Sequence, residues 1–261
     1  MKTAILVVSF GTSHPETCER NIGAIEKDLE AAFPGWELRR AFTSGMIIKK
    51  LHSRDNVRID TVTEALDSLV REGFGAVLLQ PTHILNGEEF DNLVSDAAGF
   101  ADKLSLRIGA PLLTAAADYR RLAAALIQIF PAEPDAALCL MGHGSVHFSD
   151  AAYAALDYHF KDMGRDDVFV GTVEGFPDLE TLLRHVAAHG AKRVTLAPLM
   201  VVAGDHAVND MASDGEDSWK TAFEAAGYAV TCVLKGLGEY QNIRGIYVEH
   251  AKAAAVYGGT R

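Results

Sequence analysis

The chain has 261 residues, of which 49% are hydrophobic and 23% are charged. This size and composition predict a globular protein with one large domain or two small ones, and they exclude disordered and collagen-like chains. The 35 acidic residues outnumber the 24 Lys and Arg residues, and the formal charge of −11 argues against a nucleic-acid partner. No apolar run approaches the ~18 residues of a membrane-spanning helix, so we expect no membrane association.

The first apolar run, residues 4–8, is too short for the hydrophobic region of a signal peptide, and we interpret it as a buried strand. The three cysteines, Cys18, Cys139 and Cys232, are odd in number and have no C-x-x-C spacing. They therefore predict neither a disulfide framework nor a cysteine zinc site. A reducing, cytoplasmic setting fits them best.

Short β-rich runs alternate with helical patterns along the chain. We expect strands over 3–10, 76–85, 136–144, 167–175, 193–204 and 228–236. We expect helices over 16–33, 61–73, 119–130 and 178–190, where apolar residues recur at helical spacing and a Gly or Pro follows. This order predicts an α/β fold with mostly parallel sheets that helices cover on both faces.

The second half of the chain repeats features of the first half at low identity. One strand ends in "SFGTS" and its counterpart ends in "MGHGS". Glu89 and His206 each follow a proline, Pro81 or Pro198, by eight residues. These matched offsets predict an internal duplication, with two similar α/β halves.

We place the boundary between the halves near "FPAEPDAA", where two prolines interrupt the helical pattern. The expected domains are residues 1–133 and residues 134–261. The glycine turns of both halves lack the spacing of a P-loop or of G-x-G-x-x-G, so nucleotide binding has little support. The G-x-S-x-G elbow of α/β-hydrolases is also missing from the sequence.

Three residues with metal-binding side chains, His143, Glu174 and His206, each end or closely follow a predicted strand of the second half. Open α/β sheets bind ligands at the carboxyl ends of their strands. Two imidazoles and one carboxylate are a recurrent ligand set for divalent first-row metals, and they leave coordination positions open for a substrate. The residues alone leave a second interpretation open, in which they are hydrogen-bonded or solvated groups at strand ends.

Longer segments resemble the anaerobic sirohydrochlorin cobaltochelatases, the class II chelatases of cobalamin biosynthesis. The resemblance covers essentially the whole chain and is carried by "ILVVSFGTSHPETCERNI", "RAFTSGMIIKKL", "HILNGEEF", "MGHGS", "GTVEGFP" and, most specifically, "PLMVVAGDHAVNDMASDGEDSWK". It implies two similar α/β domains with an active-site cleft between them. It also implies a cytoplasmic, homo-oligomeric lyase that inserts Co²⁺ into sirohydrochlorin, or its oxidised form, without ATP or a redox cofactor.

The resemblance implies roles for individual residues. The metal ligands fall on His143, Glu174 and His206, and His143 is also the base that accepts a pyrrole proton. Glu89 is a second catalytic candidate, for handling protons or metal. His83 is a weaker candidate in the same segment as Glu89.

Binding of sirohydrochlorin raises an electrostatic difficulty, because the substrate is rich in carboxylates and the protein is itself acidic. Backbone amides of the first glycine turn, at Gly11, Thr12 and Ser13, are candidates to offset this repulsion. Phe10 and Met200 are candidates to pack on the flat macrocycle.

Several alternatives stay open at this point. The basic segment 38–54 either contacts the substrate carboxylates or forms a solvated surface. Insertion of Fe²⁺ for sirohaem is an alternative activity, because ligand type barely separates Fe²⁺ from Co²⁺. A protein that carries metal or tetrapyrrole without turnover is another, although a carrier needs no proton acceptor such as His143 or Glu89.

Overall fold

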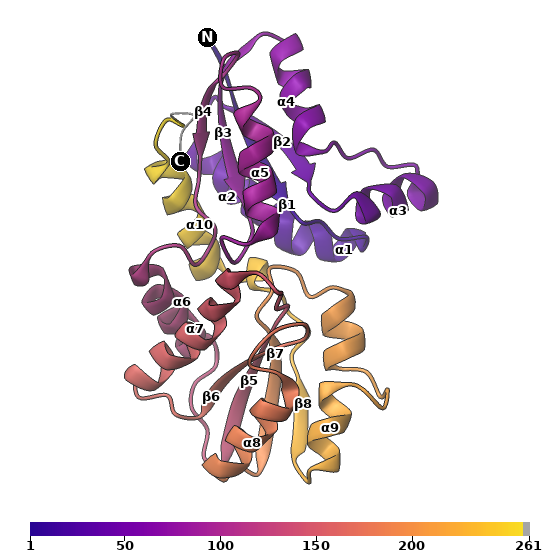
Figure 1. The fold of residues 1–261 in the computed structure, drawn as a ribbon, viewed down its shortest axis with the longest axis vertical. Helices are drawn as coiled ribbons and strands as arrows, with labels where there is room; N and C mark the ends of the chain where they lie inside the picture. The colour runs from indigo at the N-terminus through magenta and orange to yellow at the C-terminus, as the bar shows by residue number, and fades with distance from the viewer. Residues whose placement is uncertain (258–261) are drawn as a thin grey trace. The chain divides into compact units, whose positions relative to one another are not determined.

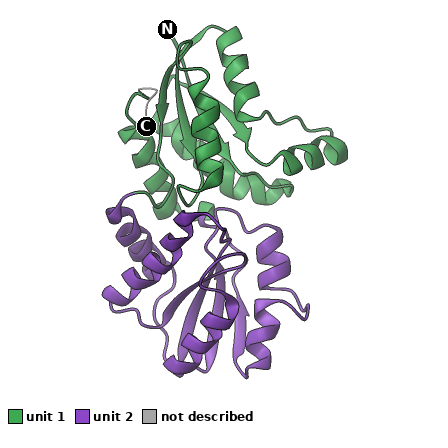
Figure 2. Ribbon diagram, in the orientation of Figure 1, with its two compact units in different colours: residues 1–114, 238–261 green, residues 115–237 purple. Residues whose placement is uncertain are grey.

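The computed structural model describes residues 1–257, which fold into two compact units (Figures 1 and 2). Unit 1 is formed by residues 1–114 together with the C-terminal segment that begins at residue 238, and unit 2 by residues 115–237. Each unit has a four-stranded, fully parallel sheet with helices around it. Within the described range, every helix is too short or too polar to cross a lipid bilayer.

The sheet of unit 1 has the strand order β2-β1-β3-β4. Its strands are β1 (Lys2–Ser9), β2 (Glu37–Phe42), β3 (Phe74–Pro81) and β4 (Ser105–Ile108). Its helices are α1 (Pro15–Cys18), the π-helical η1 (Glu19–Gly23), α2 (Ala24–Ala32), α3 (Gly45–Asp55), α4 (Val62–Arg71), α5 (Glu88–Ala98) and α10 (Gln241–Ala253).

The central strand β1 is buried along residues 4–9, as expected for a parallel strand that helices cover on both faces. Its side chains and those of β3 form a core with α4 and α5, in which Leu6, Leu66 and Leu93 are almost fully buried. Helix α4 begins at a capping box, where Thr61 and Glu64 satisfy each other's backbone amides. Hydrophobic burial and the capping box therefore both favour a helix at the position of α4.

The sheet of unit 2 has the strand order β6-β5-β7-β8. Its strands are β5 (Ala136–Gly142), β6 (Val168–Thr172), β7 (Arg193–Pro198) and β8 (Ala229–Cys232). Its helices are α6 (Ala116–Ile129), the 3₁₀ turn η2 (Phe148–Asp150), α7 (Ala151–Asp162), α8 (Leu179–His189), the π-helical η3 (His206–Met211) and α9 (Trp219–Ala225). A short 3₁₀ turn, η4 (Leu237–Glu239), then leads the chain back to unit 1.

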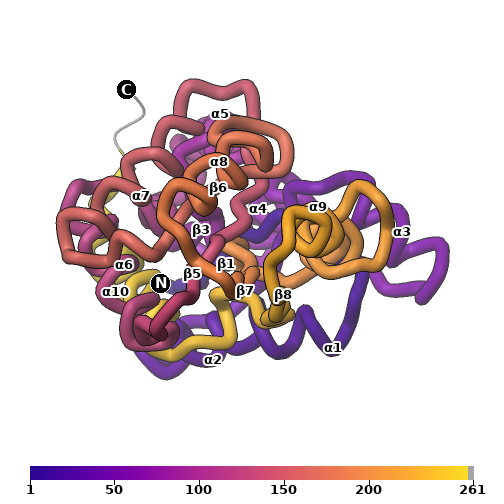
Figure 3. The backbone as a smooth tube through the Cα atoms, turned by 90° about the horizontal axis from the view of Figure 1, so that it is seen from below, coloured from indigo at the N-terminus to yellow at the C-terminus, as the bar shows by residue number. Residues whose placement is uncertain are grey.

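The direction of the crossovers decides which face of the second sheet each helix covers. The chain runs from β5 to β6 on one side and then returns past β5 to β7 on the other. Because parallel crossovers are right-handed, α7 and α8 lie on opposite faces of this sheet, as the tube drawing shows (Figure 3). Helix α9 lies on the same face as α8, since β7 and β8 continue in the same direction.

The expected α/β class, with two similar parallel-sheet halves, is confirmed. The units share one strand order, with the first strand of each unit flanked by its second and third. The units are not divided at residue 133, however, because α6 is part of unit 2 and α10 is part of unit 1. Long-range contacts fasten helix α10 to unit 1. The buried Tyr247 hydroxyl donates to the carbonyl of Thr82 at 2.9 Å, and Arg244 pairs with Asp28 at 2.7 Å.

Candidate metal centre

The carboxyl ends of β6, β5 and β7 lie side by side at one edge of the unit 2 sheet. His143 directly follows β5, Glu174 stands two residues beyond β6, and His206 is the first residue of η3, which follows β7. Because the chain reverses direction across the sheet at β5, this edge is a topological switch point. Open α/β sheets bind their ligands at such points.

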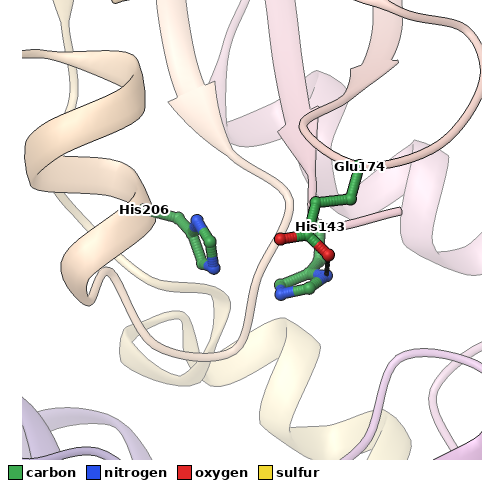
Figure 4. A group of neighbouring side chains, drawn as sticks. All are labelled: His143, Glu174 and His206. Atoms are coloured by element: carbon green, nitrogen blue, oxygen red, sulfur yellow. Dashed lines mark ion pairs between the residues drawn. The ribbon is translucent and has the colours of Figure 1, made fainter. Parts of the chain in front are cut away.

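The three side chains converge at this edge (Figure 4). One ligand atom from each of His143, Glu174 and His206 lies within 4.8 Å of the other two. The imidazole rings are 4.6 Å apart between centroids and almost perpendicular, and Nδ1 of His143 lies 4.0 Å from Oε2 of Glu174. Since metal–ligand bonds to these groups are ~2.0–2.2 Å long, the three atoms must approach one another by only about an ångström to share one ion. Among the described residues, no other set of three His, Cys, Asp or Glu side chains has this arrangement.

The converging side chains are accessible to solvent. His143 is 45% exposed, Glu174 58% and His206 36%. Structural zinc sites instead close four ligands around a buried ion, whereas catalytic sites use three protein ligands and keep a position open. The exposure and the number of ligands here match the second type.

The loops that carry His143 and Glu174 are joined by main-chain and side-chain hydrogen bonds. The amide of Glu174 donates to the carbonyl of His143 at 2.8 Å. Asp150 accepts one hydrogen bond from the amide of Ser145, in the loop after β5, and another from the amide of Phe176, in the loop after β6, at 2.8 and 3.0 Å. One carboxylate therefore fixes the distance between the two loops.

Glycine is required where these loops touch. Gly144 has a φ of +80°, in the left-handed region that residues with a Cβ rarely adopt. A Cβ at this position would lie 2.4 Å from the backbone nitrogen of Gly175 and 2.8 Å from the Cβ of Thr172. The "MGHGS" turn thus has a steric reason for its second glycine, which allows the backbone after His143 to approach the loop that carries Glu174.

Each histidine of the site has one ring nitrogen in a hydrogen bond to oxygen. Nδ1 of His143 lies 2.8 Å from the carbonyl oxygen of Gly144, and Nδ1 of His206 lies 2.6 Å from Oδ2 of Asp210. Because a carbonyl and a carboxylate only accept, a neutral ring in these positions carries its proton on Nδ1. Nε2 of both rings then keeps its lone pair for a metal ion or a proton.

Glu89, the catalytic candidate of the first half, and His83, the weaker candidate for a binding role in the same segment, belong to unit 1. Glu89 is partly buried in the first turn of α5. Both ring nitrogens of His83 are buried and have no hydrogen-bond partner within the described part of the chain. This burial lowers the pKa of His83 to about 4, so its ring is neutral at physiological pH. The catalytic role of Glu89 and the binding role of His83 stay predictions.

The candidates for substrate contact differ in their surroundings. Gly11 has a φ of +103°, and a Cβ there would lie 2.5 Å from an aromatic ring of β2. Thr12 and Ser13 are buried, whereas Phe10 is 45% exposed. Met200 is partly buried against the core of unit 2. Of the two residues expected to pack on a macrocycle, Phe10 therefore offers the more accessible apolar surface.

Part of the basic segment 38–54 is already paired with acids. Arg39 donates to Glu72 at 2.6 Å and also to Glu37, and Arg40 donates to the two carboxylate oxygens of Glu26 from Nε and Nη2 at 2.6 and 2.5 Å. These bonds raise the pKa of both arginines and neutralise their charge locally. Pairing with acids of the protein itself therefore explains Arg39 and Arg40 better than contact with substrate carboxylates does.

Sequence reasoning missed two acidic residues of the site. Asp210 lies four residues after His206, a helical spacing that could have marked the pair. Asp150 gave no such signal, because its partners Ser145 and Phe176 come from different loops that only the fold brings together.

Comparison with protein families gives a match over nearly the whole chain: the model described as cobalt chelatase (CbiK) matches residues 3–256. A sirohydrochlorin cobaltochelatase of Salmonella typhimurium is 46% identical over 256 residues, which are 97% of this chain and 97% of the relative. The sirohydrochlorin cobaltochelatase CbiKC of Nitratidesulfovibrio vulgaris is 34% identical over 261 residues, covering 97% of this chain and 90% of the relative. The range matched by the family model includes His143, Glu174 and His206.

Solved structures share the fold at low sequence identity. SirB from Bacillus subtilis with Fe³⁺ has a TM-score of 0.64 and 12% identity, with 97% of this chain and 95% of that chain covered. CbiX, described as the terminal enzyme for biosynthesis of siroheme in denitrifying bacteria, has a TM-score of 0.55 and 18% identity, covering 97% of this chain and 99% of that chain. At these sequence identities the similarity shows a shared fold and does not indicate a shared function.

Proposed function

Because the chain belongs to the cobalt chelatase family, we propose that it is a sirohydrochlorin cobaltochelatase, a lyase that inserts Co²⁺ into sirohydrochlorin without ATP or a redox cofactor. The observation that carries the proposal is the convergence of His143, Glu174 and His206 within 4.8 Å at the switch point of the second sheet. The reaction exchanges one dication for two protons, so it needs a site that both holds a metal and accepts protons.

His143, Glu174 and His206 hold Co²⁺ as the substrate metal before insertion. Imidazole nitrogens suit first-row divalent ions, and one carboxylate partly offsets the charge of the ion. Three ligands leave positions that water occupies first and the macrocycle nitrogens take later. The exposure of these side chains supports such an exchange, because the ion must leave the site in every turnover.

The proton acceptor is His143, and its lone pair sets the order of events. Nε2 of this ring has one lone pair, which either binds the ion or takes a proton. As Co²⁺ moves onto the macrocycle nitrogens, its bond to His143 breaks, and the freed Nε2 accepts the first pyrrole proton. An imidazole suits both steps near neutral pH. Glu89 is our candidate acceptor for the second proton.

We place the protein in the cytoplasm and expect it to form a homo-oligomer. Cys18, Cys139 and Cys232 are free thiols. A reducing compartment keeps such thiols from forming disulfides. The resemblance to cobaltochelatases supports the oligomeric state.

Turnover is the property that separates an enzyme from a carrier. We expect a substoichiometric amount of purified protein to convert an excess of sirohydrochlorin and Co²⁺, under anaerobic conditions, to the metallated product, followed by its visible spectrum. A mixture without protein is the control. A rate equal to that control would contradict the proposal, and product formation that stops at one equivalent of protein would identify a carrier.

Fe²⁺ insertion is the second candidate activity, because the donor atoms of the site do not discriminate strongly between Fe²⁺ and Co²⁺. The same assay with Fe²⁺ gives the ratio of the two values of kcat/KM. We expect this ratio to favour Co²⁺, since the relatives from Salmonella typhimurium and Nitratidesulfovibrio vulgaris are both named as cobaltochelatases. A higher value for Fe²⁺ would assign the protein to sirohaem formation.

A further inference from the structure

His206 is presented by a turn that is anchored in the core of unit 2. In the π-helical η3, the neighbouring residue Ala207 and the last residue Met211 are fully buried and belong to the hydrophobic core. The amide of Val208 donates to the carbonyl of Gly204 at 3.1 Å and closes the start of the turn. The backbone beneath His206 is therefore fixed.

The side chain of Asp210 approaches His206 from within the same turn. Oδ2 of Asp210 lies 2.6 Å from Nδ1 of His206, and the pair has i,i+4 spacing. Met211, next to Asp210, anchors this end of the turn as Ala207 anchors the other. The His206 ring faces His143 in Figure 4 and is thus held between Asp210 and the metal centre.

The two histidines of the site differ in what holds Nδ1. His143 bonds to the neutral carbonyl of Gly144, whereas His206 bonds to the carboxylate of Asp210. Hydrogen bonds to an ionised acceptor are roughly twice as strong as bonds between neutral groups. A carboxylate behind a metal-bound imidazole fixes its tautomer and makes the other nitrogen a better donor to the metal. The arrangement therefore makes the two rings unequal as ligands.

We propose that Asp210 is a positioning residue that makes His206 the retaining ligand of the site. Asp210 holds the His206 ring with its proton on Nδ1 and its Nε2 lone pair available to Co²⁺. His143, whose Nδ1 is hydrogen-bonded to a neutral carbonyl at 2.8 Å and lies 4.0 Å from the Glu174 carboxylate, beyond hydrogen-bond distance, releases the ion first and thereby becomes free to take a proton. This inference rests on the proposed function, because it assigns an order to the release of the metal during insertion.

A purely structural role for Asp210 makes different predictions. If the carboxylate only braced the π-helical turn, its removal would lower the thermal unfolding temperature and would leave the affinity of the folded protein for Co²⁺ unchanged. If it positions His206, the affinity falls while the unfolding temperature changes little, since Ala207 and Met211 still anchor the turn. Measuring both quantities on the same variants separates the two roles.

The test uses Asp210→Ala and Asp210→Asn in the full chain, with Co²⁺ alone as the probe in titration calorimetry. Loss of a carboxylate behind a ligand histidine costs roughly 10–100-fold in metal affinity, and we expect a loss of this size for the Ala variant. Asp210→Asn keeps an acceptor oxygen without the charge, so its affinity for Co²⁺ should fall less than that of the Ala variant. Asp217→Asn, which removes an exposed acid of the same segment, is the matched control and should bind as the wild type does.

Two further measurements complete the test. Long-range ¹H–¹⁵N NMR spectra of the metal-free wild type should show the His206 proton on Nδ1, and a proton on Nε2 would overturn the inference even if the Ala variant failed to fold. In the insertion assay, Asp210→Ala should raise the KM for Co²⁺ about 10-fold and change kcat less. Equal affinity and KM for Asp210→Ala and Asp217→Asn would also overturn it. A wild type without turnover would instead contradict the proposed function.

Discussion

At the scale of single residues, the ring of His83 lies where protonation is unfavourable. Both of its nitrogens are buried, and no described residue accepts or donates a hydrogen bond there. Burial lowers its pKa from the ordinary 6.5 to about 4. Between these two pH values the unfolded chain binds a proton that the folded chain does not. The free energy of unfolding therefore decreases as the pH falls from 6.5 toward 4.

We expect His83→Phe to remove this part of the pH dependence. Phenylalanine keeps a ring of similar size and cannot be protonated. We expect urea unfolding to show that the free energy of unfolding of the wild type falls by on the order of 2 kcal/mol more than that of the variant between pH 7 and pH 5. Each pKa unit corresponds to about 1.4 kcal/mol. His52→Phe, at an exposed position of α3, should keep the wild-type difference. Equal losses in the wild type and His83→Phe would refute the explanation.

The convergence of side chains at the candidate metal centre was predictable from the sequence in unequal measure, and their role as metal ligands stays a prediction. His143, Glu174 and His206 could be found because each ends or closely follows a strand, and parallel strands end at a common edge. The residues that hold them were harder to find. Asp150 acts across two loops, so nothing in its local sequence points to its partners.

At the scale of elements, the separation of His143 and Glu174 depends on how closely the loops after β5 and β6 approach. Gly144 and Gly164 both have a positive φ in unit 2, but their surroundings differ. A Cβ at Gly144 would lie 2.4 Å from the backbone of Gly175, whereas a Cβ at Gly164 would meet nothing within 4 Å. The two positions therefore separate the effect of backbone strain from the effect of a steric clash at the site.

Gly144→Ala should damage both stability and metal binding, and Gly164→Ala should affect stability alone. Alanine in the left-handed region costs about 1 kcal/mol, which is the loss we expect for Gly164→Ala. Gly144→Ala should cost at least about twice as much, because the loop after β6 must also move. Its affinity for Co²⁺ should fall about 10-fold or more, measured by calorimetry. Wild-type affinity in Gly144→Ala would contradict the role given to this turn.

The predicted strands include the four central strands and also β6 and β8, the edge strands of unit 2. Strands β1, β3, β5 and β7 stand inside the sheets, and each contains several buried hydrophobic residues. The missed strands, β2 and β4, are both edge strands of unit 1. β2 carries Arg39 and Arg40, whose partners Glu72 and Glu26 come from other parts of the chain. An edge strand with charged side chains has no hydrophobic pattern that a local reading could detect.

At the scale of the whole molecule, the repeat predicted from matched offsets corresponds to two units with one strand order. The boundary between the units was less predictable. Helix α10 returns to unit 1 through contacts of Tyr247 and Arg244 with residues far away in the sequence, and a composition change cannot reveal such contacts. The two units also differ in their side chains, since His143, Glu174 and His206, the three that converge at one sheet edge, all belong to unit 2.

The central claim is that His143, Glu174 and His206 form the site from which Co²⁺ is inserted. The most direct test is the rate of cobalt insertion into sirohydrochlorin by full-length His206→Ala under turnover conditions, compared with the wild type. We predict a loss of about 100-fold or more, with an unchanged circular dichroism spectrum and unfolding temperature. A folded His206→Ala protein that inserts Co²⁺ at the wild-type rate would contradict the account.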